Sequence, residues 1–142
     1  PFWNGRLPRG ALKMELKDIK LAVFKQMLAN QIGKIVVSYN GYGDSGGIEG
    51  IATFSEAGDE HSDSDFRLRN LPKINLDSQW IHNFKDEIEY FSDAVINAAG
   101  YDGYENEDGG NGTIEIDAMN QKVTIQHNWM EMVSNPEEEV SV

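Results

Sequence analysis

The sequence predicts an α+β domain, with an antiparallel sheet of four or five strands covered on one face by two helices. Two segments carry apolar residues at helical spacing, each is followed by short strand-like segments, and glycine-rich stretches separate these elements. The expected order is helix, hairpin, short strand, helix, hairpin. The 142 residues, of which 39% are hydrophobic, fit one core. We therefore expect an N-terminal extension at 1–10, a single domain at 11–133 and an acidic C-terminal tail at 134–142.

The first helix and hairpin are predicted over residues 11–54. Helical spacing within 11–32 predicts a helix that ends at Gly33, and the β-branched segment 34–39 predicts a buried strand. The next segment, NGYGDSGG, has four glycines among eight residues, so we expect a turn there. Strand-like sequence then resumes at Ile48, Ile51 and Phe54. The apolar positions of the helix are Leu12, Leu16, Ile19, Val23, Met27 and Leu28.

The second helix and hairpin are predicted after an exposed acidic loop at 55–65. A third strand is expected within 67–76, although Pro72 interrupts it. Asp77 or Ser78 is expected to cap a helix that ends at Gly100. The alternating segments TIEIDA and VTIQHNW, joined by MNQK, predict the second hairpin. The apolar positions of this helix are Trp80, Ile81, Phe84, Ile88, Phe91 and Val95.

A short internal echo accompanies the two helix–hairpin units. Residues 39–42 read Tyr-Asn-Gly-Tyr and residues 101–104 read Tyr-Asp-Gly-Tyr, and each is followed by a loop of glycines and acids and then a strand. These residue types are common near turns, so chance could produce the echo. The alternative is that two similar half-units pack together.

The charge is −12 and is unevenly distributed. Residues 1–34 carry seven basic and two acidic residues, a net of +5, and the rest carries five basic and 22 acidic residues, a net of −17, which together give −12. A surface that negative repels nucleic acid and attracts basic proteins, so we expect a basic protein partner. The lysines of the first helix are most simply a solvated face, or they dock on the acidic half of the same chain or of a second copy, which would give a homodimer.

The absence of cysteine excludes disulfides and favours a reducing compartment such as the cytoplasm. The longest apolar runs are a few residues, far short of the roughly 20 that span a bilayer, so we expect no membrane association. The opening PFWNGRLPRG has neither an initiator Met nor an apolar region, so it resembles neither a signal peptide nor an ordinary start.

Acidic residues among glycines suggest a divalent cation site. Carboxylates on flexible backbone are the ligands that Ca²⁺ and Mg²⁺ use, and the candidate ligands are Asp44, Asp102, Glu107 and Asp108. The spacing does not fit an EF-hand. A structured, metal-free acidic turn explains the same residues, so apart from Ca²⁺ or Mg²⁺ we expect no cofactor.

Two features suggest catalysis at first sight. GDSGG at 43–47 reproduces the nucleophile loop of trypsin-like proteases, but this chain has no His before residue 61 and is too short for their double barrel. His127 follows the acidic loop on a neighbouring strand and could act as a general base with Asp44 or Asp108. A structural histidine is the alternative, and we expect no enzyme.

The segments YNGYGDSGGIEGI at 39–51, GYENEDGGNGTIEID at 103–117 and QHN at 126–128 together resemble a family of small bacterial and phage-borne proteins of unknown function. In that family a GDSG box precedes an aromatic-Glu-Asn-x-Asp-Gly-x-x-Gly box and a strand with a His-Asn pair. Tyr104 occupies a position where Trp is expected. The resemblance implies a shared fold and no assigned activity.

We expect a non-catalytic interaction or inhibitor protein, of the immunity or anti-defence type, that binds a basic partner. A metal-binding module or metal-dependent enzyme built on the two loops is the alternative. Both readings require the two glycine-rich segments to lie side by side. The candidate binding residues are Tyr42, Asp44, Ser45, Glu49, Tyr104, Glu105, Asn106, Asp108 and His127.

Overall fold

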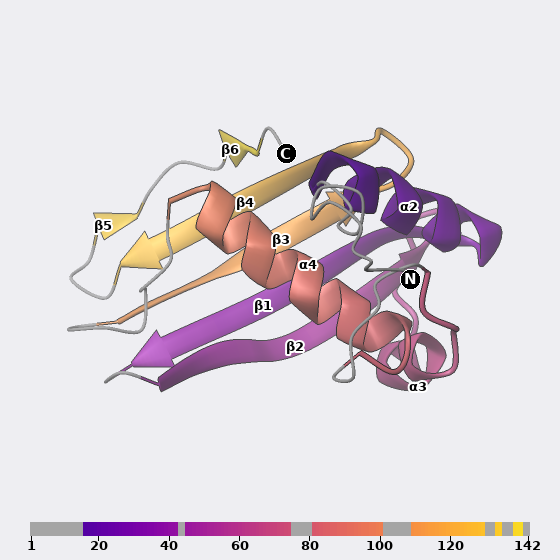
Figure 1. Cartoon of the computed structure of the whole chain (residues 1–142), viewed down its shortest axis with the longest axis horizontal. Helices are drawn as coiled ribbons and strands as arrows, with labels where there is room; N and C mark the ends of the chain where they lie inside the picture. The colour runs from indigo at the N-terminus through magenta and orange to yellow at the C-terminus, as the bar shows by residue number, and fades with distance from the viewer. Residues whose placement is uncertain are drawn as a thin grey trace, which may run out of the picture.

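The computed structural model describes residues 16–42, 45–74, 81–100, 109–129, 133–134 and 138–140. Within these residues, six strands form one antiparallel sheet in the order β2-β1-β3-β4-β5, and β6 also pairs with β4. The α+β class, the antiparallel sheet and the layer of helices on one face are confirmed (Figure 1). The helices are α2 (Leu16–Ala29), α3 (Ser64–Arg69) and α4 (Phe84–Ala98), and the strands are β1 (Ile32–Tyr42), β2 (Ser45–Ser55), β3 (Gly110–Asp117), β4 (Lys122–Trp129), β5 (Val133–Ser134) and β6 (Glu138–Glu139).

Two helix–hairpin units meet at the centre of the sheet. The hairpins β1–β2 and β3–β4 adjoin because β1 pairs with β3, in a register that runs from Lys34 opposite Asp117 to Gly41 opposite Gly110. The two half-units suggested by the sequence echo therefore share one continuous sheet. Figure 1 shows α2 and α4 on the same side of this sheet.

The core lies between that helix layer and the sheet. Alternate residues of each long strand point into it, because successive side chains of a strand point to opposite faces. Each large apolar side chain buried there stabilises the fold by about 1.5–3 kcal/mol. The fully buried apolar members include Val23, Met27, Ile35, Val37, Phe84, Ile88, Phe91, Val95, Ile114 and Ile116. No described helix has both the length and the apolar character needed to cross a membrane.

The prediction that Gly33 caps the first helix is wrong. The helix ends at Ala29, and Gln31, with φ of 60°, makes the left-handed turn into β1. Gly33 belongs to β1, where a Cβ would lie 2.9 Å from the Cα of Glu56 and 3.0 Å from the carbonyl oxygen of Ser55. This glycine therefore allows a close approach of two backbones. The predicted helical residues 11–15 lie outside the described residues.

The first hairpin is longer than predicted. β1 continues to Tyr42 and β2 begins at Ser45, with these two residues paired, so only 43–44 separate the strands. Most glycines of the expected turn are therefore inside strands. Their lack of side chains does not prevent pairing, because strand hydrogen bonds use the backbone.

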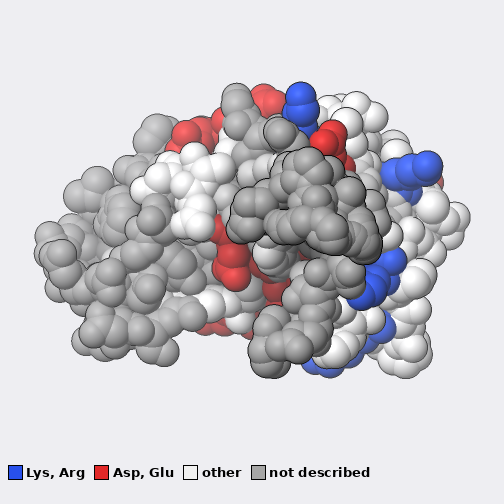
Figure 2. Space-filling view, in the orientation of Figure 1, with Lys and Arg blue, Asp and Glu red and all other residues white. Residues whose placement is uncertain are grey.

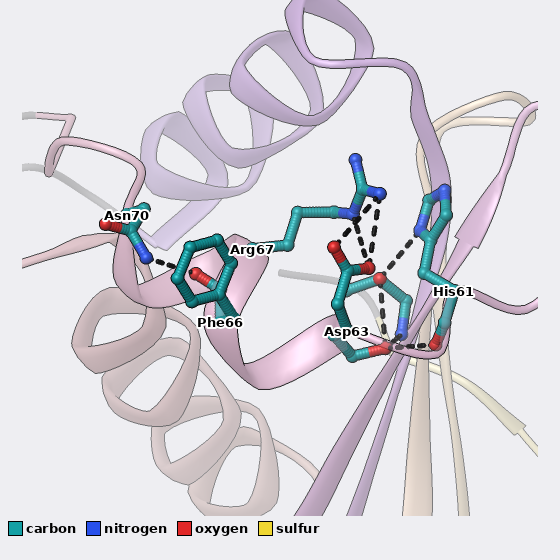
Figure 3. A network of polar contacts seen from close by, with 7 residues as sticks. His61, Asp63, Phe66, Arg67 and Asn70 are labelled. Carbon is teal, nitrogen blue, oxygen red and sulfur yellow. Dashed lines mark hydrogen bonds and ion pairs between the residues drawn. The ribbon is translucent and has the colours of Figure 1, made fainter.

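The strand predicted within 67–76 is also wrong, because this region begins with the short helix α3. Arg67 and Arg69 pair with Asp63 and Asp65, one helical turn earlier, at 3.2 and 2.7 Å. Leu68 is buried, whereas Phe66 is 68% exposed, so only one side of the helix meets the core. Figure 3 shows Arg67 folded back onto Asp63.

The loop predicted at 55–65 is tied to β2 by a buried polar network. Ser64 Oγ accepts a hydrogen bond from the Thr53 backbone N–H at 2.9 Å and donates one to the His61 carbonyl at 3.0 Å. Thr53 Oγ1 and His61 Nδ1 are 2.8 Å apart (Figure 3). The first two hydrogen bonds satisfy backbone groups beside the core, and together the three hold the start of α3 against β2.

The second long helix begins later than predicted. Its N-cap is Asn83, whose side chain accepts a hydrogen bond from Asp86 N at 3.0 Å, and not Asp77 or Ser78. Asp86 in turn accepts from the backbone N–H of His82 at 2.8 Å, so the two side chains satisfy exposed N–H groups at this end. The expected end at Gly100 is confirmed, because this residue has φ of 87° directly after the last helical turn.

Within the predicted acidic tail at 134–142, the described residues 138–140 pack against the rest of the domain. Glu138 and Glu139 are exposed, but their backbone pairs with Ile125 and Thr124 of β4. Val140, which follows them, is buried in the core. Glu138 and Glu139 are therefore charged residues of a short strand at the edge of the sheet, a common feature of sheet edges.

Candidate functional site

Most residues proposed from the sequence as binding or metal ligands lie outside the described part of the chain. These are Asp44, Asp102, Tyr104, Glu105, Asn106, Glu107 and Asp108. The backbones of Tyr42 and Ser45 pair at the end of the first hairpin. Glu49 and His127 are described with their side chains, on β2 and β4. Among the described residues, no three His, Asp or Glu side chains come close enough together to hold a metal ion.

The strand ends next to both glycine-rich segments lie together. Gly41 pairs with Gly46 of β2 and with Gly110 of β3, and Gly110 pairs with Trp129 of β4. Residues 43–44 directly follow the last residue of β1. Residues 101–108 end one residue before Gly109, which directly precedes β3, so a single residue separates them from that strand. The ends of β1 and β4 and the starts of β2 and β3 therefore lie at the same end of the sheet, which we call the glycine-rich end (Figure 1). That their carboxylates meet stays a prediction.

On the core face near this end, Tyr39 and His127 form a buried polar pair. The Tyr39 hydroxyl and His127 Nδ1 are 2.5 Å apart, and the two rings stack with centroids 5.7 Å apart and planes 15° from parallel. Tyr39 is 1% exposed and His127 is 0% exposed. The burial predicted for Tyr39 is thus observed.

Gly112 makes this pairing possible. The two rings come from β1 and β4, which are not neighbours, and Gly112 of β3 lies between them in the register. A Cβ on Gly112 would lie 2.6 Å from the Tyr39 hydroxyl and would also collide with the carbonyl oxygen of Gln126. The missing side chain leaves the space that Tyr39 crosses to reach His127.

Burial lowers the pKa of His127 below its ordinary value of 6.5, so the ring is neutral at pH 7. A general base must reach the proton that it removes, and this imidazole is shielded from solvent and bonded to Tyr39. The geometry therefore favours the structural alternative for His127 over the general base. Asp44 and Asp108, its suggested partners, lie outside the described residues.

The opposite face of the sheet, which we call the open face, carries polar side chains at this end. Asn40, Asn111 and Asn128 lie in one row across β1, β3 and β4, and Asn128 Nδ2 donates to Asn111 Oδ1 at 3.3 Å. A second row contains Ser38, Thr113 and Gln126. The two rows line a shallow depression of about 370 Å³, whose lining comprises Ser38, Tyr39, Asn40, Glu49, Asn111, Gly112, Thr113, Gln126 and Asn128.

Glu49 reaches this depression because of a β-bulge. The register between β1 and β2 shifts between Ser38 and Tyr39, whose partners are Gly50 and Ile48, so Glu49 is the extra residue. Ile48 on one side of it packs against the core. Among the described residues that line the depression, Glu49 alone is charged, and it is exposed.

Sequence reasoning identified Glu49 but missed the amide and hydroxyl residues beside it. Each of the three asparagines directly precedes or follows a core-facing position of its strand, so alternation placed them on the open face. Strand alternation alone did not show that they share a row. That information is in the register, which joins residues far apart in the sequence.

Acidic and basic side chains are unevenly distributed over the described surface. Beyond the depression, the open face carries Glu115 of β3, which is opposite Thr124 of β4. On the other side of Thr124 lies Glu139 of β6. On the helix side, Lys and Arg side chains gather at the end formed by α2 and α3 (Figure 2). The glycine-rich end of the sheet is at the far side from these cations in Figure 1.

Comparison with known proteins identifies the family and no function. No curated protein and no solved structure matches the chain. A family model, described as a family of unknown function (DUF6878), matches residues 16–139, which include all the described strands and helices. The chain belongs to this family of unknown function.

Proposed function

We propose that this chain is a small acidic binding protein, without catalytic activity, that binds a basic protein through the open face of its sheet. The observation that supports it most directly is the exposed polar depression beside Glu49 on a face that α2 and α4 do not cover. Interaction surfaces of this kind combine hydrogen-bonding side chains with complementary charge.

The charge of the open face suits a basic partner. Glu49, Glu115 and Glu139 occupy the part nearer the depression. Two described lysines of this face, Lys34 and Lys122, lie at the opposite end of the sheet from the glycine-rich end. Asp117 lies between them in the same row across β1, β3 and β4. Residues 35–142 as a whole carry −17, from five basic and 22 acidic residues. Such a field speeds the association of cationic proteins, and salt screens it.

The environment of His127 supports a non-catalytic role. A neutral histidine that is buried and bonded to Tyr39 contributes to packing and does not exchange protons with a ligand on the surface. We further propose that the chain is an immunity or anti-defence protein of a bacterium or phage and acts in the cytoplasm. This proposal rests on the composition and on the resemblance carried by the GDSG box and the aromatic-Glu-Asn-x-Asp-Gly-x-x-Gly box. Such proteins block a partner by covering it.

The test is capture of cationic proteins from a lysate of the source cells on the immobilised chain, at low and at high salt. A discrete basic protein should be retained at low salt and released by salt, and should bind the purified chain directly. The variant Glu115→Gln/Glu139→Gln removes two charges from the open face and should weaken that binding. The control Asp18→Asn/Glu56→Gln removes two charges elsewhere and should not.

Two results would contradict the proposal. One is that no basic protein binds directly at low salt. The other is that the open-face variant and its charge-matched control weaken binding equally, because binding would then reflect only total charge.

The metal-binding alternative rests on residues outside the described part of the chain. A thermal shift with Ca²⁺, Mg²⁺ or Mn²⁺ tests it, because an ion that binds the folded state raises stability. Our proposal predicts no specific stabilisation by any of the three. A homodimer formed through the basic face of α2 would show itself as a salt-sensitive change in molecular mass on light scattering.

A further inference from the structure

Two glycines lie beside the depression, and no packing contact among the described residues requires either of them. Gly47 and Gly50 are exposed residues of β2, opposite Asn40 and Ser38 of β1. A Cβ at either position would meet no atom within 4 Å, and neither backbone has a positive φ. Glycine inside a strand costs about 0.5–1 kcal/mol relative to alanine. Such a glycine often marks a β-bulge, as Gly50 does beside Glu49, or a place where a ligand or another backbone approaches closely.

The contrast with other glycines of the sheet supports this interpretation. A Cβ at Gly110 would lie 3.0 Å from the His127 ring, and one at Gly112 would collide with Tyr39. Packing therefore requires those two glycines. Among the described residues, no packing contact requires a glycine at position 47 or 50, although Gly50 adjoins the bulge at Glu49. The space beside both glycines is open, and a partner could occupy it.

The depression beside these glycines is rich in hydrogen-bonding side chains, and the one charged group among its described residues is a hydrogen-bond acceptor. Glu49 supplies a carboxylate, and Asn40, Asn111, Gln126 and Asn128 supply amide oxygens. No Lys or Arg is among the described residues that line it. A ligand with one positive charge and several donors in a plane would match this set.

We propose that the depression binds the guanidinium group of an arginine side chain of the basic partner, with Glu49 as its counter-ion. This proposal rests on the proposed function and names the group that is recognised. Guanidinium has five N–H donors in a rigid plane, which can bond a carboxylate and neighbouring amide oxygens together. Lysine has a compact charge with three donors, so it fits this broad row of acceptors less well.

Gly47 and Gly50 of β2 leave open space beside the depression, next to Glu49. Without side chains there, the partner backbone that carries the arginine can lie against the edge strand. β2 is the outer strand of the sheet, and in its described first part it pairs only with β1. The partner segment would therefore approach at a sheet edge, where polypeptides commonly dock.

The test uses an arginine oligomer and a lysine oligomer of equal length, titrated into the full chain by calorimetry. The wild-type chain should bind the arginine oligomer several-fold more tightly. Glu49→Gln should reduce affinity for the arginine oligomer on the order of tenfold, as expected for one charge-assisted hydrogen-bonded contact, and should abolish the preference. Amide resonances of Gly47 and Gly50 should shift when the arginine oligomer binds.

Gly50→Val is the most informative variant, because valine fills the space beside the depression and favours a strand. The melting temperature should stay the same or rise, while affinity for the arginine oligomer should fall several-fold. Ala52→Val is the matched control on the same strand and face, away from the depression, and should leave affinity unchanged.

Equal affinity for the two oligomers, or full arginine binding by Glu49→Gln or Gly50→Val, would overturn the inference. The proposed function would survive any of these results if a basic protein still bound the chain directly and if the variant Glu115→Gln/Glu139→Gln still weakened that binding. Failure of both oligomers to bind the wild-type chain at low salt would overturn the inference as well.

Discussion

The two faces of the sheet at its glycine-rich end use neighbouring residues for opposite purposes. Tyr39 is buried and bonded to His127, whereas Asn40, the next residue, is exposed on the open face. On β3 and β4, Gly112 and His127 face the core while Asn111 and Asn128 line the depression. A one-residue change of register would exchange these two sets.

Polar groups on the two faces are satisfied in different ways. The buried pair of Tyr39 and His127 is held by a short hydrogen bond and by stacked rings, because a buried polar group that lacks a partner is costly. On the open face Asn40 is exposed, whereas Asn111 and Asn128 are half-buried and hydrogen-bonded to each other. The difference teaches that polar residues adjacent in the sequence can lie in very different environments, one buried in the core and the next on the open face.

The largest expected effect separates the two kinds of glycine. Gly112→Ala should destabilise the fold by about 3 kcal/mol or more, because its Cβ would overlap Tyr39 and the Gln126 carbonyl. Gly47→Ala should be neutral or stabilise by about 0.4–1 kcal/mol. Urea unfolding at constant temperature measures both. Similar values for the two variants would remove the distinction on which the arginine site depends.

The next effect concerns the buried pair. Tyr39→Phe keeps the ring but removes the hydroxyl that contacts His127 Nδ1, so the fold should lose about 1–3 kcal/mol. A double-mutant cycle with His127→Leu should show that the two losses are not additive. Additive losses would mean that the two side chains stabilise the fold independently.

The third prediction is the pH dependence that His127 causes. Its folded pKa is lowered by burial, so the unfolded chain takes up a proton at a higher pH than the folded chain. Stability from this group is therefore complete above the ordinary value of 6.5 and is lost as the pH falls from there towards the folded pKa. His127→Gln should flatten the stability profile in this window. An unchanged slope in the variant would contradict the prediction.

The smallest effect is expected on the open face. Asn40→Ala should change the free energy of unfolding by no more than about 0.5 kcal/mol, because the side chain is exposed. It should nevertheless weaken binding of the arginine oligomer, since one amide acceptor is lost. A large loss of stability would show that the row of asparagines belongs to the structural framework and not to a binding surface.

The helix–hairpin repeat was predictable because its signals are local. Helical and alternating spacing show in single segments, and both hairpins were found on that basis. The strand expected at 67–76 failed because two i,i+4 ion pairs and one buried leucine favour the helix α3 there. The cap expected at Asp77 or Ser78 failed because Asn83 and Asp86 form a better start six residues later.

The site was less predictable than the fold. Glu49 was expected to bind a ligand, but its place beside the amides results from a bulge that only pairing with β1 produces. His127 was a candidate general base, whereas its partner Tyr39 was predicted only as part of a buried strand. The row of Asn40, Asn111 and Asn128 could not be predicted, since each strand by itself shows one polar position among several.

By itself, the sequence determined the class of fold, the two helix–hairpin units and the strongly acidic balance of residues 35–142. These properties follow from composition and from spacing within short segments. Only the tertiary structure decided which polar residues are buried and which form a surface. The contact between Tyr39 and His127 joins residues 88 apart, and such contacts depend on strand register, which neighbouring residues do not specify.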